Sequence, residues 1–280
     1  MRTAPSQLDR RWVYSRWYDE DTQESYPILF SDEINRIYRT PTMLEDKAQV
    51  IPKEMENVIV MIVEMDQDGI DAAPTLTQNV AAWRTYGQLS NLVLGMAEFI
   101  RGLGYQALPM LNDTALSIPL AIDAGLGQLG RSGLLITPWF GPRCRICKIL
   151  TDLPLKTNWP IDFGVTAFCE ACKKCVHYCP AGALSKTRRS YETGSLSSNG
   201  GALKWTFDAE KCQRYKMSIG SNCGVCIRVC PYNKSHHWYH GVVRWLIENV
   251  SLSNPFWIKM DGILSYGKFK NPEKYFWRPL

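Results

Sequence analysis

Residues 168–180 have the sequence FCEACKKCVHYCP, and residues 223–231 have the sequence CGVCIRVCP. In the first segment, two residues separate each of the first three cysteines, and three residues precede a fourth cysteine that is followed by proline. In bacterial proteins with this spacing, the first three thiolates bind one [4Fe–4S] cluster and the fourth binds a second cluster. The segments therefore predict two neighbouring clusters and a protein that transfers electrons.

The predicted ligands form two crossed sets, in which each motif gives one thiolate to the cluster of the other. The first set comprises Cys169, Cys172, Cys175 and Cys230. The second set comprises Cys179, Cys212, Cys223 and Cys226. The segment QRYKMSIGSN lies between Cys212 and Cys223, where a regular motif has two residues, so we expect an inserted loop there.

Structural zinc and disulfide bonds are the alternative interpretations of these cysteines. Zinc sites commonly pair two CxxC units per metal and do not need the CxxxCP step, which occurs here twice. Disulfides are typical of short secreted chains, and this sequence of 280 residues opens on no recognisable signal peptide. Two iron–sulfur clusters are therefore favoured.

The composition is that of a globular protein, with 45% hydrophobic and 21% charged residues. The longest apolar stretches, such as VIVMIV at 58–63, are far shorter than the roughly 20 residues of a membrane-spanning helix. The formal net charge of +5 is mild. It is compatible with nucleic acid, an anionic membrane surface or an acidic electron donor, and a solvated basic face is the default interpretation.

The first 155 or so residues show the pattern of an α/β layer domain. Residues 1–57 have no long periodic segment and are expected to be irregular, with short helices. Buried strands are predicted over 58–65, 105–110, 133–137 and 145–150. A helix is predicted from apolar residues at helical spacing, before Gly102 and Gly104: Leu89, Leu92, Val93, Met96, Ala97 and Ile100. Asp113 is expected to cap a second helix that runs to residue 124.

Several other patterns have ordinary structural interpretations. GLGQLG at 125–130 fits a dinucleotide fingerprint but follows a helix instead of a strand, so a tight turn is favoured over close approach to a planar cofactor. Cys144 and Cys147 are expected to be buried thiols, and a metal site at the histidines of residues 236–240 is disfavoured. Five tryptophans are predicted to lie in the core: Trp205, Trp238, Trp245, Trp257 and Trp277.

The string NDTALSIPLAIDAGLGQLGRSGLLITPWFGPRCRICKILTDLPL, the double cysteine motif after it and the ending ILSYGKFKNPEKYFW resemble a known family. The resemblance is to the catalytic subunit of corrinoid-dependent reductive dehalogenases, from about residue 50 onward. Members of that family normally carry a twin-arginine export signal and a further N-terminal stretch. Arg10 and Arg11 lack the apolar core of such a signal, so a fragment, a mature form or a short member is expected.

The resemblance implies an α+β fold. An α/β, nitroreductase-like layer domain that binds corrinoid and substrate is expected at 1–157, N-terminally incomplete. A bacterial ferredoxin-like domain with two [4Fe–4S] clusters is expected at 158–240. Residues 241–280 are expected to form an aromatic C-terminal segment that packs back on the core.

The resemblance also implies a mechanism, in which a base-off corrinoid is reduced to cobalt(I) and attacks the organohalide while the clusters deliver electrons singly. Matched motif to motif, the family's tyrosine proton donor falls on Tyr86, with an arginine on Arg145 and an asparagine on Asn112. A tyrosine is a poor acid unless its phenolate is stabilised, and a neighbouring guanidinium supplies that stabilisation. Without the resemblance, a core aromatic, a surface ion pair and a helix cap are the favoured interpretations of these residues.

Further expectations follow from the family. Contacts to the corrinoid are expected from Ser117, Gly130, Arg131 and Ser132. The expected partners are an organohalide substrate, a low-potential electron donor and a small membrane anchor protein, with no nucleic acid. The expected location is the outer face of the cytoplasmic membrane, with the cytoplasm as the alternative.

Two rival functions remain open at this point. An epoxyqueuosine reductase uses the same cofactors, but its family generally has a catalytic aspartate and often C-terminal helical repeats. A non-catalytic iron–sulfur electron carrier needs only about residues 165–235 and leaves the α/β domain without a role.

Overall fold

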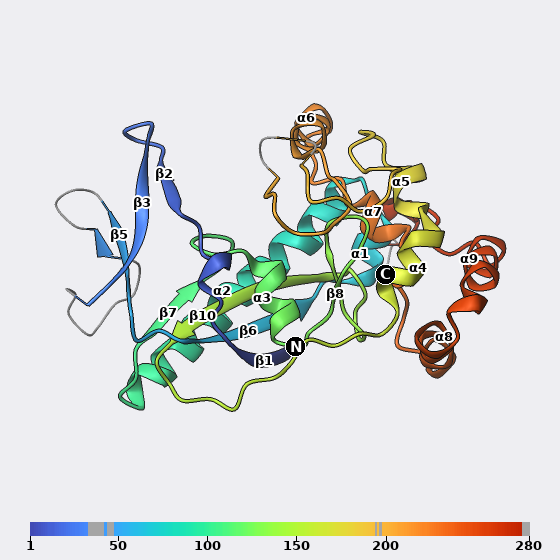
Figure 1. The fold of residues 1–280 in the computed structure, drawn as a ribbon. Coiled ribbons are helices and arrows are strands. Elements are labelled where there is room, and N and C mark those ends of the chain that lie inside the picture. The colour runs from blue at the N-terminus through green and yellow to red at the C-terminus, as the bar shows by residue number, and fades with distance from the viewer. Residues whose placement is uncertain (33–41, 44–47, 194, 196–197, 276–280) are drawn as a thin grey trace. The chain divides into compact units, whose positions relative to one another are not determined.

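The computed structural model describes residues 1–32, 42–43, 48–193, 195 and 198–275. The chain forms two compact units and passes between them more than once (Figure 1). The first unit comprises residues 1–63, 86–126 and 145–160. The second comprises residues 64–85, 127–144 and 161–280.

A four-stranded sheet forms the centre of the first unit, with strand order β1-β6-β10-β7. Its strands are β1 (Arg2–Gln7), β6 (Asn57–Glu64), β7 (Ala107–Met110) and β10 (Cys144–Thr151). Strand β1 runs antiparallel to β6, with Arg2 opposite Ile62, and β7 runs antiparallel to β10, with Met110 opposite Lys148. Three of the predicted strands, over 58–65, 105–110 and 145–150, are therefore confirmed.

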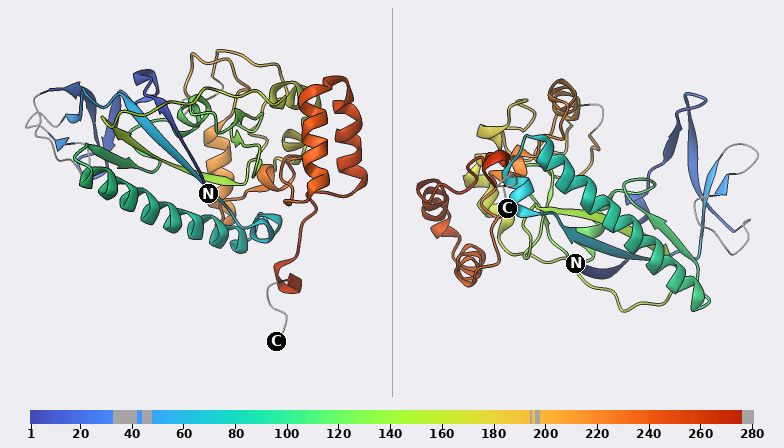
Figure 2. Two further views of the ribbon diagram at one scale, coloured as in Figure 1. Left: turned by 90° about the horizontal axis from the view of Figure 1, so that it is seen from below. Right: turned by 180° about the vertical axis from the view of Figure 1, so that it is seen from behind.

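Helix α2 (Leu76–Gly102) contributes the main apolar face to this sheet, and its first-unit part lies along one side of it (Figure 2). Leu89, Val93 and Ala97 are buried against residues of β6 and β10 such as Met61 and Ile149. The helical spacing predicted this face, and the helix ends at Gly102 as expected. Its beginning at Leu76 is earlier than the apolar pattern indicated.

The expectation of irregular structure over residues 1–57 was wrong for the described part of that segment. It contains β1 and a second sheet of order β2-β3-β5-β4, built from β2 (Arg16–Asp19), β3 (Glu24–Ser31), β4 (Thr42–Met43) and β5 (Gln49–Pro52), with the 3-10 turn η1 (Arg10–Trp12). Strand β1 buries only two small residues, Ala4 and Ser6. Such short alternation is too weak to predict a strand before its partner is known.

Helix α3 (Ser117–Asp123) starts later than predicted, and Asp113 does not cap it. The N-cap is Leu116, and Asp113 instead accepts a hydrogen bond from the backbone nitrogen of Leu111 at 2.9 Å. Ala115 forms a β-bridge with Val13, and the backbone of Leu116 is extended. That long-range pairing holds the chain out of the helical conformation until Ser117.

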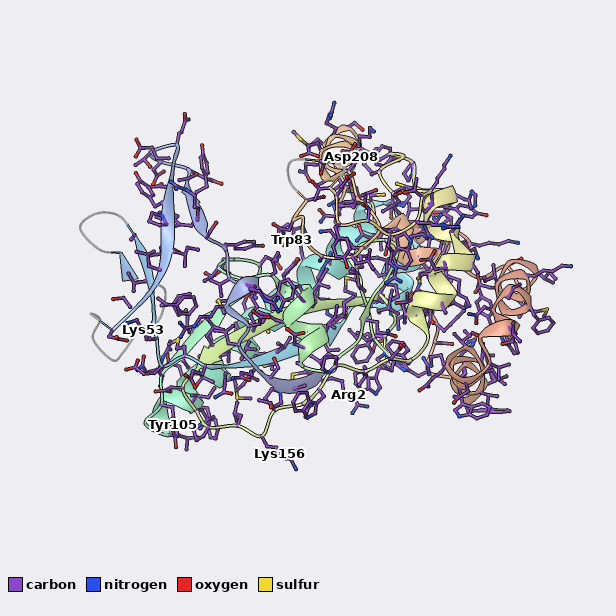
Figure 3. All side chains as sticks on the ribbon, in the orientation of Figure 1. Arg2, Lys53, Trp83, Tyr105, Lys156 and Asp208 are labelled. Carbon is purple, nitrogen blue, oxygen red and sulfur yellow. The ribbon has the colours of Figure 1, made fainter. Side chains whose placement is uncertain are left out.

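The second unit is mainly helical. Its elements are α1 (Gln67–Asp71), β8 (Gln128–Leu129), β9 (Leu135–Ile136), α4 (Val165–Cys172), α5 (Lys174–Tyr178), α6 (Ala209–Ile219), α7 (Val225–Arg228), α8 (Trp238–Asn249), η2 (Ser251–Ser253), α9 (Asn254–Ile263) and α10 (Pro272–Tyr275). Asp208, labelled in Figure 3, caps α6 by accepting from the backbone nitrogen of Lys211. The inserted loop between Cys212 and Cys223 thus consists largely of helix.

The glycine-rich segment at 125–130 makes the turn that leads into the β8–β9 hairpin. Gly125 has a positive φ of 72°, directly after the end of α3. A Cβ on Gly127 would lie 2.2 Å from the carbonyl oxygen of Ile136. The glycines therefore permit close backbone packing, as the tight-turn interpretation predicted.

The tryptophans were predicted correctly only in part. Trp205 is buried, and Trp257 packs against the apolar cluster of Phe168. Trp238 and Trp245 lie on α8 and are 80% and 59% exposed, so the core prediction for these two was wrong. Helices α8 and α9 lie side by side (Figure 2), and the buried residues of α8 are His240 and Ile247. Trp277 lies outside the described residues.

Candidate functional site

The structure brings Tyr86, Asn112 and Arg145 together in the first unit. Tyr86 lies on α2, Asn112 follows β7, and Arg145 is near the start of β10. The amide Nδ2 of Asn112 donates a hydrogen bond to the Tyr86 hydroxyl oxygen at 2.9 Å. The Arg145 guanidinium carbon lies 5.0 Å from the centre of the Tyr86 ring. A phenol therefore lies next to one amide donor and one permanent positive charge.

Arg145 has an unused hydrogen-bond donor. Its Nε atom is buried and has no hydrogen-bond partner among the described residues. A buried donor without a partner costs about 1–3 kcal/mol. An anionic or electron-rich ligand beside Tyr86 would remove that cost, and a guanidinium suits such a ligand in charge and geometry.

Lys148 belongs to the same region, although no sequence motif indicated it. It is fully buried on β10, and its Nζ donates to the carbonyl oxygen of Leu111 at 2.6 Å and to Ser117 Oγ at 3.1 Å. Burial lowers the pKa of Lys148 to about 8, against the opposing effect of Asp113. Lys148 therefore holds the chain directly before Asn112. A lysine within the apolar run RICKIL was the available signal.

The four residues expected to contact a corrinoid do not belong to one unit. Ser117 belongs to the first unit, and Gly130, Arg131 and Ser132 to the second, in the turn of the β8–β9 hairpin. Arg131 is buried, and its Nε donates to the carbonyl oxygen of Cys169 at 2.9 Å. Its other nitrogens bond Ser185 O, Thr187 O and the Glu170 carboxylate. The Arg131 side chain thus fits a role beside the first cysteine set better than contact with a corrinoid.

The first set of cysteines converges on one place in the second unit. The pKa of the Cys230 thiol is raised, chiefly by burial and then by the charges of Cys169, Cys175 and Cys172. A cavity is lined by all four of these cysteines together with Gly130, Arg131, Ser132, Ile136, Phe168, Lys173, Pro231 and Tyr232. Buried thiols crowded together ionise readily only next to a metal, so this donor set fits an iron–sulfur cluster.

The second set shows the same arrangement. The pKa of the Cys226 thiol is raised to about 12, chiefly by burial and then by the charges of Cys223, Cys212 and Cys179. The charge of Cys226 also contributes to the raised pKa of the Cys175 thiol in the first set. The members of each predicted set thus lie near one another, and the assignment of one cluster to each set stays a prediction.

Tyr232 is a further residue of this site that no sequence motif indicated. Its ring packs edge-on against Phe168, with centroids 5.3 Å apart, and it lines the cavity of the first set. Its hydroxyl oxygen is buried and has no hydrogen-bond partner among the described residues.

Cys144 and Cys147 are buried thiols, as expected. His236 Nε2 lies 2.9 Å from a carboxylate oxygen of Glu64, and His240 is buried with its pKa lowered to about 4, chiefly by burial. In the described ranges, no three His, Cys, Asp or Glu side chains are arranged to hold a single metal ion. The ligands of a cubane each bind a different iron, so this finding does not concern the cysteine sets.

Known proteins match the chain in both sequence and fold. A family model described as a 4Fe-4S double cluster binding domain matches residues 168–233. The tetrachloroethene reductive dehalogenase of Sulfurospirillum multivorans is 37% identical over 95% of this chain and 54% of that protein. A tetrachloroethene reductive dehalogenase of Desulfitobacterium hafniense is 34% identical over 95% of this chain and 51% of that protein. The chain thus spans about half the length of the curated relatives it matches.

The solved structure of the catabolic reductive dehalogenase NpRdhA has a TM-score of 0.75 and 24% identity, over 96% of this chain and 35% of that one. This likeness supports the mixed α and β fold. An epoxyqueuosine reductase of Lactococcus garvieae is 30% identical over 52% of this chain and 40% of that protein. The match to dehalogenases is both stronger and longer, which confirms the resemblance found in the sequence. The chain belongs to the reductive dehalogenase family.

Proposed function

We propose that the protein replaces the carbon–halogen bond of an organohalide with a carbon–hydrogen bond. The reaction consumes two electrons and one proton and releases a halide ion. The observation that carries the proposal is the contact of Asn112 with the Tyr86 hydroxyl beside Arg145. This arrangement holds a proton donor next to a site for an anion, which is what the reaction requires.

Each residue of the trio has a role that its chemistry supports. Tyr86 donates the proton. Asn112 stabilises the phenolate that remains, because its amide already donates to the phenol oxygen. The Nε of Arg145, which has no hydrogen-bond partner in the described part of the chain, holds the departing halide. Lys148 is a positioning residue, since it holds the carbonyl of Leu111 next to Asn112.

The cofactors are proposed from family membership and from the cysteine sets. A bound corrinoid would supply the reduced cobalt chemistry that cleavage of a carbon–halogen bond needs. The first and second cysteine sets each hold one [4Fe–4S] cluster, with Cys179 and Cys230 as the crossed ligands. The first unit is proposed to belong to a nitroreductase-like layer domain that binds the corrinoid, with Ser117 as one contact.

The substrate class and partners are also proposals. The matched relatives are named for tetrachloroethene, so a chlorinated alkene is the first substrate to test. A low-potential donor and a small membrane anchor on the outer face of the cytoplasmic membrane are proposed from the family. Among the helices that the structure describes, none is long and apolar enough to span a bilayer.

The test is halide release by the protein after anaerobic reconstitution with iron, sulfide and a corrinoid. With tetrachloroethene and a reduced viologen, we expect chloride and trichloroethene in equal amounts, with two viologen radicals oxidised per chloride. A protein with its clusters and a base-off corrinoid spectrum that releases no chloride from this or other organohalides would contradict the proposal.

A further inference from the structure

Tyr232 has a buried hydroxyl that the proposed reaction does not use. Only 4% of the residue is exposed, and its oxygen has no hydrogen-bond partner among the described residues. Edge-on contacts with Phe163 and Phe168, at centroid distances of 6.1 and 5.3 Å, fix the ring. The hydroxyl therefore cannot easily turn toward solvent, and an unpaired hydroxyl in a core destabilises the fold.

The surroundings of Tyr232 indicate which acceptor it meets in the loaded protein. Tyr232 lines the same cavity as the first cysteine set. Cys169, Cys172 and Cys230 also pack against the apolar cluster that contains Tyr232. Two further side chains of the wall, Arg131 and Lys173, only donate hydrogen bonds, and Arg131 is bonded to backbone carbonyls. Besides the hydroxyl of Ser132, the sulfurs of the four cysteines are thus the side-chain acceptors in this wall.

We infer that the Tyr232 hydroxyl donates a hydrogen bond to a sulfur of the cluster held by Cys169, Cys172, Cys175 and Cys230, and raises the reduction potential of that cluster. The inference rests on the cluster assignment in the proposed function. A reduced cluster carries one more negative charge than an oxidised one, so a donor to its sulfur stabilises the reduced form more. Tyr232 is then a positioning and tuning residue for electron transfer.

The second cysteine set offers a matched comparison. Tyr178 directly precedes Cys179, but it is 55% exposed, so water is available to its hydroxyl. Removal of the Tyr178 hydroxyl leaves the environment of a cluster sulfur almost unchanged. Removal of the Tyr232 hydroxyl takes away a donor in a site from which water is excluded, where hydrogen bonds to charged acceptors are strong.

The experiment compares Tyr232→Phe with Tyr178→Phe in the reconstituted protein, by redox titration of each cluster followed by electron paramagnetic resonance. In Tyr232→Phe, we expect one cluster to become about tenfold harder to reduce, which is ~59 mV for a one-electron couple. The other cluster should keep its potential, and Tyr178→Phe should shift neither. Resonance Raman spectra should show a deuterium-sensitive iron–sulfur mode in the parent that is lost only in Tyr232→Phe.

Two results would overturn the inference. One is a Tyr232→Phe protein with the parent's iron content and unchanged potentials for both clusters. The other is loss of a cluster in Tyr232→Phe, because that would show that the fold itself depends on the hydroxyl. Neither result involves halide release. A parent protein that binds no cluster would instead contradict the proposed function on which the inference rests.

Discussion

Asn112 donates a hydrogen bond from Nδ2 to the hydroxyl oxygen of Tyr86 at 2.9 Å. The two residues come from different elements, the loop after β7 and helix α2, and the fully buried Lys148 supports the loop. An amide that donates to a phenol oxygen stabilises the phenolate that a proton donor leaves behind. This relationship makes the two residues a pair, and the pair can be tested.

Asn112→Ala should lower turnover about 10- to 100-fold, since a hydrogen bond to a charged group contributes about 1.5–3 kcal/mol. In a Tyr86→Phe background the same change should cost little, because the oxygen that accepts the bond is gone. A double-mutant cycle measures this coupling. Independent effects of the two substitutions would show that Asn112 acts elsewhere.

Arg145→Lys should be nearly as harmful as loss of the proton donor. Lysine keeps the positive charge but has no planar fork, so it cannot serve the phenol and the halide together. Turnover and inhibition by added halide are the measurements. If the variant keeps parental turnover and halide affinity, charge alone is sufficient at this position.

The lowered pKa of Lys148 predicts that the free energy of unfolding changes with pH in the alkaline range. Burial lowers its pKa from 10.5 to about 8, so between these values the unfolded chain binds more protons than the folded chain. The free energy of unfolding should therefore rise between pH 8 and 10.5 through this residue, while its cost to the fold is fully present below pH 8. Chemical denaturation at pH 7.5 and 9.5 should show a smaller gain in Lys148→Met than in the parent. An equal gain in both proteins would exclude Lys148 as its source.

The crossed ligands predict which cluster each cysteine variant affects. The reconstituted parent should hold about eight iron and eight sulfide per chain. Cys230→Ser should impair the cluster bound mainly by the 168–180 motif, and Cys179→Ser the other, as read from their separate resonance signals. Four iron in the parent would contradict two clusters, and damage confined to the mutated motif would contradict the crossing.

The sequence predicted those parts of the molecule whose constraints are local. Cysteine spacing predicted two ligand sets whose members lie near one another in the structure, and the helical spacing from Leu89 to Ile100 predicted the buried face of α2. Tyr86, Asn112 and Arg145 carried no local signal of their own. Family motifs selected them, and only the fold brings their side chains together.

What the sequence did not predict depends on partners distant in the chain. Strand β1 is defined by pairing with β6, and the late start of α3 is due to the bridge of Ala115 with Val13. Lys148 lies in the apolar run RICKIL, and Tyr232 directly follows the second cysteine motif. Neither position indicates a polar role. Their importance is visible only once burial and hydrogen-bond partners are known.

The central claim is that Tyr86 supplies the proton in a reductive dehalogenation. Its most direct test is the turnover of Tyr86→Phe protein with the parent's corrinoid and iron content, under saturating reductant. General-acid catalysis contributes roughly 10²–10⁴-fold, and the ring still packs without its hydroxyl, so chloride release should fall by that factor. Chloride release at the parental rate would contradict the account.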